Sequence, residues 1–147
     1  MQVFALPLAR ILLSLMFIFA GYTKVIGYGP MNMEVWTGAV KGMMIPGTTN
    51  PLPNPELLAQ ISGWAEFIAG IMLFIGILSR ITAFGLFVFV IVASVLGHAF
   101  WTYADAAQAM PQIGNFLKNM GVAGGLLLII AAGGGALGID GMFRRRP

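Results

Sequence analysis

The chain has no cysteine, and this absence removes several kinds of redox centre. Without cysteine in its 147 residues, it can form no disulfide, thiolate-bound iron–sulfur cluster or thioether-attached haem. Its single histidine, His98, excludes bis-histidine haem ligation and a multi-histidine metal site, so no metal centre is expected. Any redox chemistry must therefore use a bound organic cofactor or a partner protein.

The chain also carries little charge. Charged residues make up 9% of it, hydrophobic residues make up 59%, and the mean hydropathy is +0.89. Ordinary soluble domains are far less apolar. The eight basic residues are scattered along the chain and make no basic face, so nucleic-acid binding is not expected. Because a spanning helix needs about 20 apolar residues, the length predicts about four spans in a single membrane domain, residues 1–147.

Apolar runs separated by breaker residues predict an all-α, polytopic bundle of four transmembrane helices. The expected spans are residues 3–26, 56–78, 81–101 and 115–139, with external loops at 27–55 and 102–114 and a tail at 140–147. A secretory signal peptide is the alternative for the first run, but no small-residue cleavage site follows it. A short interfacial helix is expected between Asn32 and Met44, with Trp36 at headgroup depth.

The basic residues predict the orientation of the bundle. Arg80 lies in the short turn between the second and third spans, and residues 144–146 are all arginine. Cytoplasmic segments are enriched in arginine and lysine, so both termini and the Arg80 turn are expected in the cytoplasm. The reverse orientation would translocate the arginine cluster.

Glu66 is the most informative residue, because it lies about eleven residues into the second span, near mid-bilayer. A charge there costs at least about 2.5 kcal/mol, so Glu66 should be neutral, paired or facing a polar cavity. Helical periodicity places Arg10 and Lys24 on one stripe of the first span, and His98 and Lys118 on inward stripes of the third and fourth. We expect these five side chains to converge on a shared chamber.

Glu66 and His98 are the catalytic candidates of this chamber. The candidates for cofactor binding are three cations and two tryptophans: Arg10, Lys24, Trp64, Trp101 and Lys118. The tryptophans are expected to border a pocket in the outer leaflet, the alternative being an aromatic belt at the membrane interface. For Glu66, the alternative to a ligand or proton site is an internal ion pair with His98 or Arg10 that fixes helix register.

Methionine and glycine each leave a question open. The first loop holds Met31, Met33, Met43 and Met44. Thioethers can bind copper(I), although their ordinary use here is as apolar anchors. The fourth span carries the pairs Gly121/Gly125 and Gly134/Gly138. This spacing permits close helix approach, either within the bundle or between copies of the chain.

Four segments stand in a characteristic order. They are the opening LARILLSLMFIFAGYTKVIG, then WAEFIAGIMLFIGILSRITA, GHAFW and the final NFLKNMGVAGGLLLIIAAGGGALGID. Together they resemble the DoxX family of small four-helix bacterial inner-membrane proteins over nearly the whole chain. The resemblance implies an inner-membrane location and association with oxidoreductase complexes, in some relatives a thiosulfate-to-quinone system. It also implies that Arg10, Lys24, Glu66, His98 and Lys118 are the family's polar signature.

The leading hypothesis is a membrane subunit of an oxidoreductase or respiratory system that binds a quinone in the outer-leaflet pocket, rather than a stand-alone redox enzyme. One alternative is a non-catalytic scaffold that anchors or assembles a partner enzyme, and another is a small proton-coupled transporter. The expected partners are the lipid bilayer, a quinone or lipid ligand, and a partner protein or a second copy of the chain.

Overall fold

The computed structural model describes residues 2–28 and 30–144, which are mainly helical. The elements follow in the order α1 (Gln2–Val25), α2 (Met33–Lys41), α3 (Pro55–Ile75), α4 (Ser79–Gly97), η1 (Phe100–Thr102), α5 (Ala106–Ala132) and α6 (Ile139–Arg144). Of these, α1, α3, α4 and α5 are long and apolar enough to cross a membrane. The prediction of an all-α bundle of four spanning helices is confirmed, and α2 is the short helix expected in the first loop.

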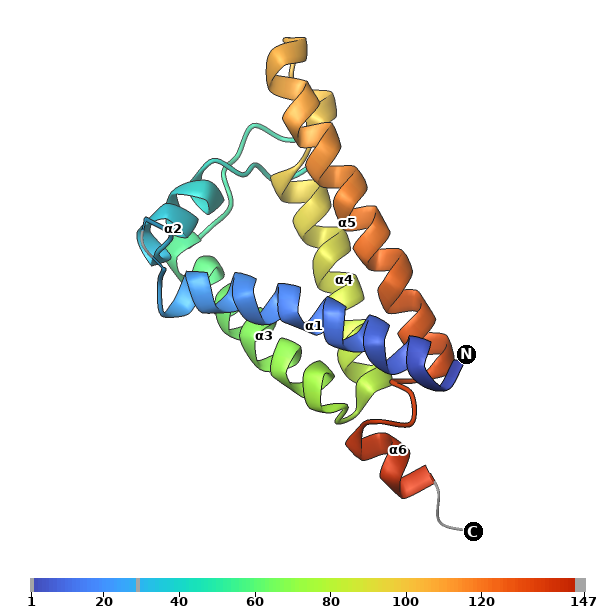
Figure 1. The fold of residues 1–147 in the computed structure, drawn as a ribbon. Coiled ribbons are helices and arrows are strands. Elements are labelled where there is room, and N and C mark those ends of the chain that lie inside the picture. The colour runs from blue at the N-terminus through green and yellow to red at the C-terminus, as the bar shows by residue number, and fades with distance from the viewer. Residues whose placement is uncertain (1, 29, 145–147) are drawn as a thin grey trace.

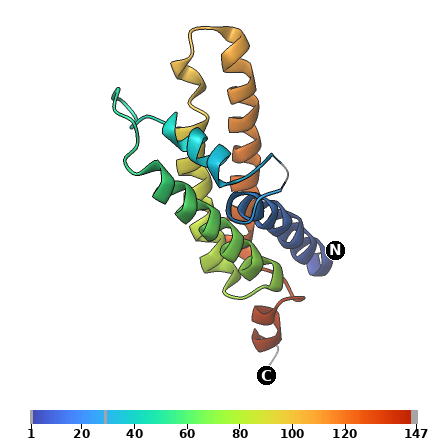
Figure 2. The same cartoon turned by 90° about the vertical axis from the view of Figure 1, so that its left-hand side faces the viewer.

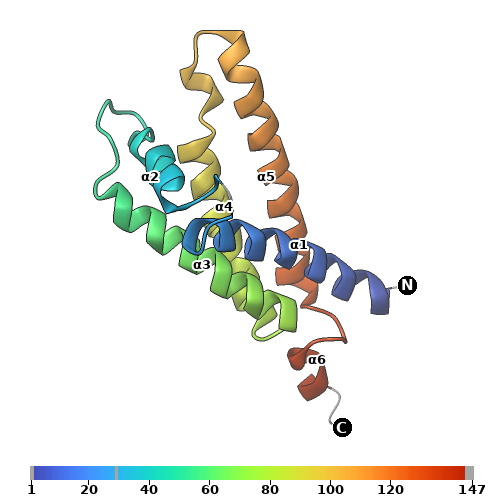
Figure 3. The ribbon, with the colours of Figure 1, turned by 60° about the vertical axis from the view of Figure 1, so that its left-hand side comes forward.

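The four long helices form two antiparallel pairs. α1 packs mainly on α3, and α4 packs mainly on α5. Figures 1 and 3 show that the pairs meet near the tight turn between α3 and α4 and diverge toward the other end. One end of the bundle holds this turn, the first residues of α1, and α6. We call it the turn end. The opposite end, with α2 and η1, is the loop end, where α2 packs against α3 and α1 (Figure 2).

Glycines bring α1 and α3 into backbone contact. A methyl group added to Gly70 of α3 would lie 2.8 Å from the backbone nitrogen of Ile18 in α1. One added to Gly63 would lie 2.9 Å from Cβ of Lys24. Such contacts through small residues are typical of membrane helices. The resulting register sets the last turn of α1 against the middle of α3.

The apolar core lies where the two pairs meet. Phe17 of α1, Leu73 of α3, Leu86 of α4 and Leu126 of α5 are buried in one cluster. Many large apolar side chains on the outer faces are exposed instead, including Ile81 of α4. Lipid chains are as apolar as these side chains, so an outer surface of this kind suits a membrane bundle.

α5 begins and ends earlier than the fourth span predicted from the sequence. It covers residues 106–132 rather than 115–139. Asp105 caps its start, because the side chain accepts a hydrogen bond at 3.0 Å from the backbone N–H of the second helical residue. At the other end, Gly133 and Gly135 have φ angles of 85° and 83°, a backbone conformation that glycine adopts without strain and that ends the helix.

The glycine pairs of the fourth span differ in position from the prediction. Gly134 and Gly138 lie beyond the end of α5, so they do not serve as a helix-packing pair on a span. Within α5, Gly125 faces Leu13 of α1, whereas Gly121 faces open space. Only Gly125 therefore helps α5 approach another helix of the bundle.

Candidate functional site

Lys24 and Glu66 form an ion pair inside the bundle. Nζ of Lys24, in the last turn of α1, lies 2.5 Å from Oε2 of Glu66, near the middle of α3. The two side chains are only 11% and 8% exposed. A carboxylate at mid-membrane depth needs a partner of opposite charge, and Lys24 is that partner.

Two aromatic rings flank the ammonium group of Lys24. It lies 4.8 Å from the ring centroid of Trp36 in α2 and 5.7 Å from that of Phe89 in α4. A cation near an aromatic face is attracted by the ring quadrupole, by about 2 kcal/mol when both are desolvated. Lys24 of α1 therefore contacts α2, α3 and α4. We call Lys24, Glu66, Trp36 and Phe89 the Lys24 site.

The indole N–H of Trp36 is an unsatisfied donor within this site. Its Nε1 atom is buried and has no hydrogen-bond partner among residues 2–28 and 30–144. A buried donor without an acceptor costs about 1–3 kcal/mol. Because the ring lies beside the Lys24 ammonium group, the site combines an unused N–H donor with a buried cation. Both groups are hydrogen-bond donors, so oxygen acceptors on a small molecule suit this site.

Arg10 lies at the turn end, away from the Lys24 site. It precedes Lys24 by fourteen positions along α1, which is about 21 Å of helix. Its side chain is buried, and Nη2 donates a hydrogen bond to the carbonyl oxygen of Leu137 at 3.0 Å. Gly76 and Gly138 pack against the guanidinium group, so that a side chain at either would collide with it. Arg10 thus joins α1, the α3–α4 turn and the segment after α5, and we call Arg10, Gly76, Leu137 and Gly138 the Arg10 junction.

His98 and Lys118 lie apart from the Lys24 site. Nδ1 of His98, just after α4, is 2.9 Å from Oε1 of Gln112 in α5. Lys118 is exposed on α5. Within the described part of the chain, Glu66 makes its ion pair with Lys24 and not with any of the other cations. The expectation that five side chains share one chamber is therefore wrong. Arg10 lies at the other end of α1, and the helix pairs diverge toward the loop end, where His98 and Lys118 belong to the second pair (Figure 1).

Trp64 and Trp101 face outward rather than toward the Lys24 site. Their exposed fractions are 49% and 55%. Trp64 packs edge-on against Phe67 with ring centroids 6.4 Å apart, and Trp101 packs against Phe100 and Phe116 at 5.0 Å and 6.0 Å. Exposed aromatic rings of this kind are typical of an interfacial belt, which the sequence offered as the alternative.

Trp36 and Asp140 have contacts that the sequence does not predict. α2 folds back so that Trp36 covers Lys24, whereas the sequence suggests only an interfacial ring. The carboxylate of Asp140 accepts hydrogen bonds from the backbone N–H groups of Leu78 and Ser79, at 2.9 Å and 2.6 Å, and so caps α4. The sequence shows Asp140 only as an acidic residue at the end of an apolar run. This pattern does not indicate that its partner lies 61 residues earlier in the chain.

The fold and the Lys24 site together define a small four-span membrane protein with a charged pair buried between its helices. The sequence matches the DoxX family over residues 5–99, and the chain belongs to that family. The resemblance seen in the sequence is thus confirmed. Residues 55–145 also match the SURF4 family.

Two relatives from Escherichia coli (strain K12) align along almost the whole chain. The protein named Inner membrane protein YphA is 32% identical over 135 residues, which cover 92% of this chain and 87% of YphA. Inner membrane protein YqjF is 29% identical over 138 residues, which cover 94% of this chain and 91% of YqjF. No solved structure matches the chain significantly.

Proposed function

We propose that this chain is a bacterial inner-membrane subunit of an oxidoreductase system and that the Lys24 site binds the headgroup of a quinone. The observation that carries this proposal is the buried indole N–H of Trp36, which lacks a partner among the described residues and belongs to the ring over which the ammonium group of Lys24 lies. Membership of the DoxX family supports the link to redox systems. The names of the two E. coli relatives support the inner-membrane location.

A quinone suits the chemistry of the Lys24 site. Its carbonyl oxygens accept hydrogen bonds, and both Trp36 and Lys24 carry N–H donors. Its ring and tail are apolar, as are Phe89 and the lipid around the bundle, and a few polar groups in an apolar shell are the usual form of a small-molecule site. Glu66 balances the charge of Lys24, which keeps the cation in place at membrane depth.

Trp36→Phe tests the quinone site, because it keeps an aromatic ring at this position and removes the N–H donor. Purified protein in lipid nanodiscs is titrated with a short-chain ubiquinone or menaquinone analogue, and the dissociation constant is measured by calorimetry. The variant should bind about three- to tenfold more weakly than wild type. Trp64→Phe is the matched control, because Trp64 is exposed outside the site. Equal binding by Trp36→Phe and wild type, or no binding by either, would remove the proposal.

A non-catalytic scaffold is the second candidate, and the geometry of the ion pair favours it. Lys24 and Glu66 satisfy each other at 2.5 Å, so the pair needs no ligand. A scaffold should retain its partner enzyme when both charges are removed in Lys24→Met/Glu66→Leu and should lose it when the exposed surface of α2 is altered, for example at Lys41. Copurification of the two variants with associated proteins separates this function from quinone binding.

We infer that the turn end faces the cytoplasm. The exposed Arg80 at this end supports that orientation by the positive-inside rule. Because the chain lacks cysteine, single introduced cysteines report accessibility without background. Thr49→Cys, in the exposed loop after α2, should react with an impermeant maleimide in spheroplasts, and Arg80→Cys only after lysis. The opposite labelling pattern would reverse the orientation.

A further inference from the structure

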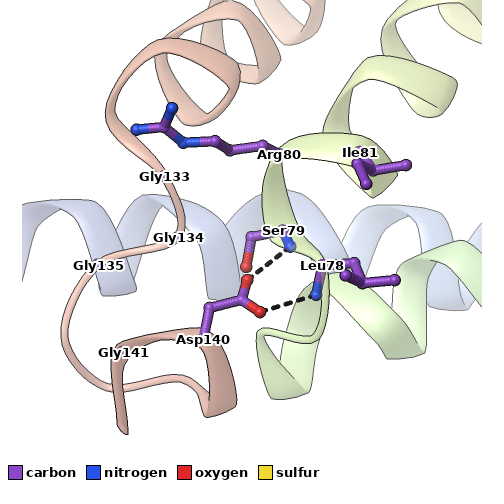
Figure 4. Close-up of a pocket in the computed structure, with 9 residues that line it drawn as sticks. All are labelled: Leu78, Ser79, Arg80, Ile81, Gly133, Gly134, Gly135, Asp140 and Gly141. Atoms are coloured by element: carbon purple, nitrogen blue, oxygen red, sulfur yellow. Dashed lines mark hydrogen bonds between the residues drawn. The ribbon is translucent and has the colours of Figure 1, made fainter. Parts of the chain in front are cut away.

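A pocket at the turn end lies away from the Lys24 site and adjoins the Arg10 junction, because Gly134, one of its lining residues, packs on Arg10. Its volume is about 500 Å³, within the usual range for small-molecule sites. Residues 78–81 at the start of α4, the glycine run 133–135 after α5, and Asp140 with Gly141 line it (Figure 4). We call it the turn-end pocket.

Two opposite charges border the turn-end pocket. Figure 4 shows Arg80 and Asp140 on opposite sides of Ser79. Arg80 is exposed, so its guanidinium group is free to meet an anion at the pocket mouth. The two oxygens of Asp140 each accept one backbone N–H bond. A carboxylate has about four acceptor sites, so Asp140 can still accept bonds from a donor in the pocket.

Asp140 is held in its charged form. Partial burial acts to raise its pKa, but hydrogen bonds from Ser79 and Leu78 and the positive charge of Arg10 outweigh burial and hold the pKa below its usual value. At neutral pH the pocket therefore presents a carboxylate on one side and a guanidinium on the other. A ligand with one anionic and one cationic group matches this pattern better than a simple anion does.

The pocket combines polar groups with exposed apolar side chains. Ser79 is 1% exposed and lines the pocket, and its hydroxyl helps to lower the pKa of Asp140. Beside these polar groups, Leu78 and Ile81 also line the pocket and are 53% and 68% exposed. Polar groups thus adjoin an apolar surface at one end of a membrane bundle, the combination that a phospholipid requires.

We propose that the turn-end pocket binds the headgroup of a zwitterionic aminophospholipid, with the phosphate at Arg80, the primary ammonium at Asp140, and the upper part of the acyl chains over Leu78 and Ile81. Phosphatidylethanolamine has this chemistry. A choline headgroup is a poorer match because its quaternary ammonium has no N–H to donate to the carboxylate. A purely anionic lipid is a poorer match because Asp140 repels a second negative charge. This inference does not depend on the quinone site.

Native mass spectrometry can measure the lipid preference directly. The full chain is reconstituted in vesicles of equal parts phosphatidylethanolamine, phosphatidylcholine and phosphatidylglycerol, extracted gently, and the fraction of each lipid adduct is recorded. Wild type should retain phosphatidylethanolamine above the other two. Arg80→Gln should lower its retention about tenfold, the loss expected for a charge-assisted hydrogen bond.

Lys41→Gln is the matched control, because it removes one exposed cation at the other end of the molecule. It should leave retention unchanged. Ser79→Ala provides a second variant that keeps every charge, and it should weaken retention about threefold, because the hydroxyl of Ser79 supports the Asp140 carboxylate that receives the ammonium. Soluble phosphoethanolamine, added as a competitor, should displace the lipid only weakly because it lacks acyl chains.

Three results would overturn the lipid site. Retention in Arg80→Gln equal to wild type would mean that Arg80 holds no phosphate. Phosphatidylglycerol retained as well as phosphatidylethanolamine would mean that Asp140 recognises no ammonium. Displacement by soluble phosphoethanolamine at concentrations comparable to the lipid would assign the pocket to a free amino-phosphate instead.

Discussion

The two buried cations of α1 are accommodated in different ways. Lys24 contacts a carboxylate directly, at 2.5 Å, and is covered by two aromatic rings. Arg10 has one carbonyl acceptor, glycines packed on both sides, and two nitrogens, Nε and Nη1, without a partner in the described residues. Its counter-charge, Asp140, acts on it only through space.

This difference indicates separate purposes for the two ends of α1. In a direct ion pair each charge is neutralised by its partner. The stability of the Lys24 site therefore depends on the single carboxylate of Glu66. An arginine stays charged and has five fixed N–H donors, and Arg10 uses one of them to join segments that are far apart in the sequence. Substitutions that remove a charge should therefore destabilise the Lys24 site most. Substitutions that add atoms beside the guanidinium group should destabilise the Arg10 junction most.

The largest expected effect is that of Glu66→Gln. It leaves Lys24 buried with no opposite charge, and breaking a buried pair in this way destabilises by about 3–5 kcal/mol. The unfolding free energy is measured by titrating the detergent-solubilised protein with sodium dodecyl sulfate. The double variant Lys24→Met/Glu66→Leu removes both charges and should recover most of the loss. If the single and double variants are equally unstable, charge is not what matters at this site.

Gly138→Ala should have the second-largest effect. Its new methyl group would collide with the guanidinium of Arg10 and lie 3.1 Å from Cα of Gly76. Overpacking of this kind costs about 1–3 kcal/mol, measured by the same titration. Gly121→Ala is the matched control, because a methyl group there meets open space and alanine is the better helix former by about 1 kcal/mol. A Gly138→Ala protein as stable as wild type would show that the junction tolerates displacement of Arg10.

The four spanning helices could be predicted from the sequence, because apolar runs and the breaker residues between them are local signals. The identity of the partner of Glu66 could not. Helical periodicity gives the face on which Glu66 and His98 lie, but not the angle between the helix pairs. That angle separates Glu66 in α3 from His98, which contacts Gln112 within its own pair. The end of α5 depended on Gly133, whose positive φ ends a helix that composition alone would continue.

The contacts of α2 and of the C-terminal segment also could not be predicted from the sequence. Trp36 reaches Lys24 only because α2 folds back onto α1 and α3. The sequence did place Lys24 and Glu66 among the candidates, since charges at membrane depth need partners. It ranked Arg10 and Lys118 with them, although Arg10 belongs to a junction and Lys118 is exposed.

Asp140→Asn should have a smaller effect, of about 1 kcal/mol at neutral pH, because asparagine offers one acceptor oxygen for the two N–H groups that Asp140 caps. The folded-state pKa of Asp140 lies below its usual value. Its contribution is therefore complete above the unfolded pKa of about 4 and is lost as pH falls through the folded value. The difference in unfolding free energy between wild type and Asp140→Asn should shrink in acid. A difference that stays constant from pH 7 to pH 3 would contradict this account of the cap.

Lys41→Gln should have the smallest effect on stability, because it removes an ion pair that is exposed to water. Nζ of Lys41 lies 3.0 Å from Oε1 of Glu56, but the two side chains are 58% and 61% exposed. Water and salt screen such a pair, so its loss should leave the unfolding midpoint unchanged within error, at low and at high ionic strength. Lys24 and Glu66 differ from this pair chiefly in burial. A clear destabilisation by Lys41→Gln would mean that contact between opposite charges, rather than their exclusion from water, sets the importance of the Lys24 site.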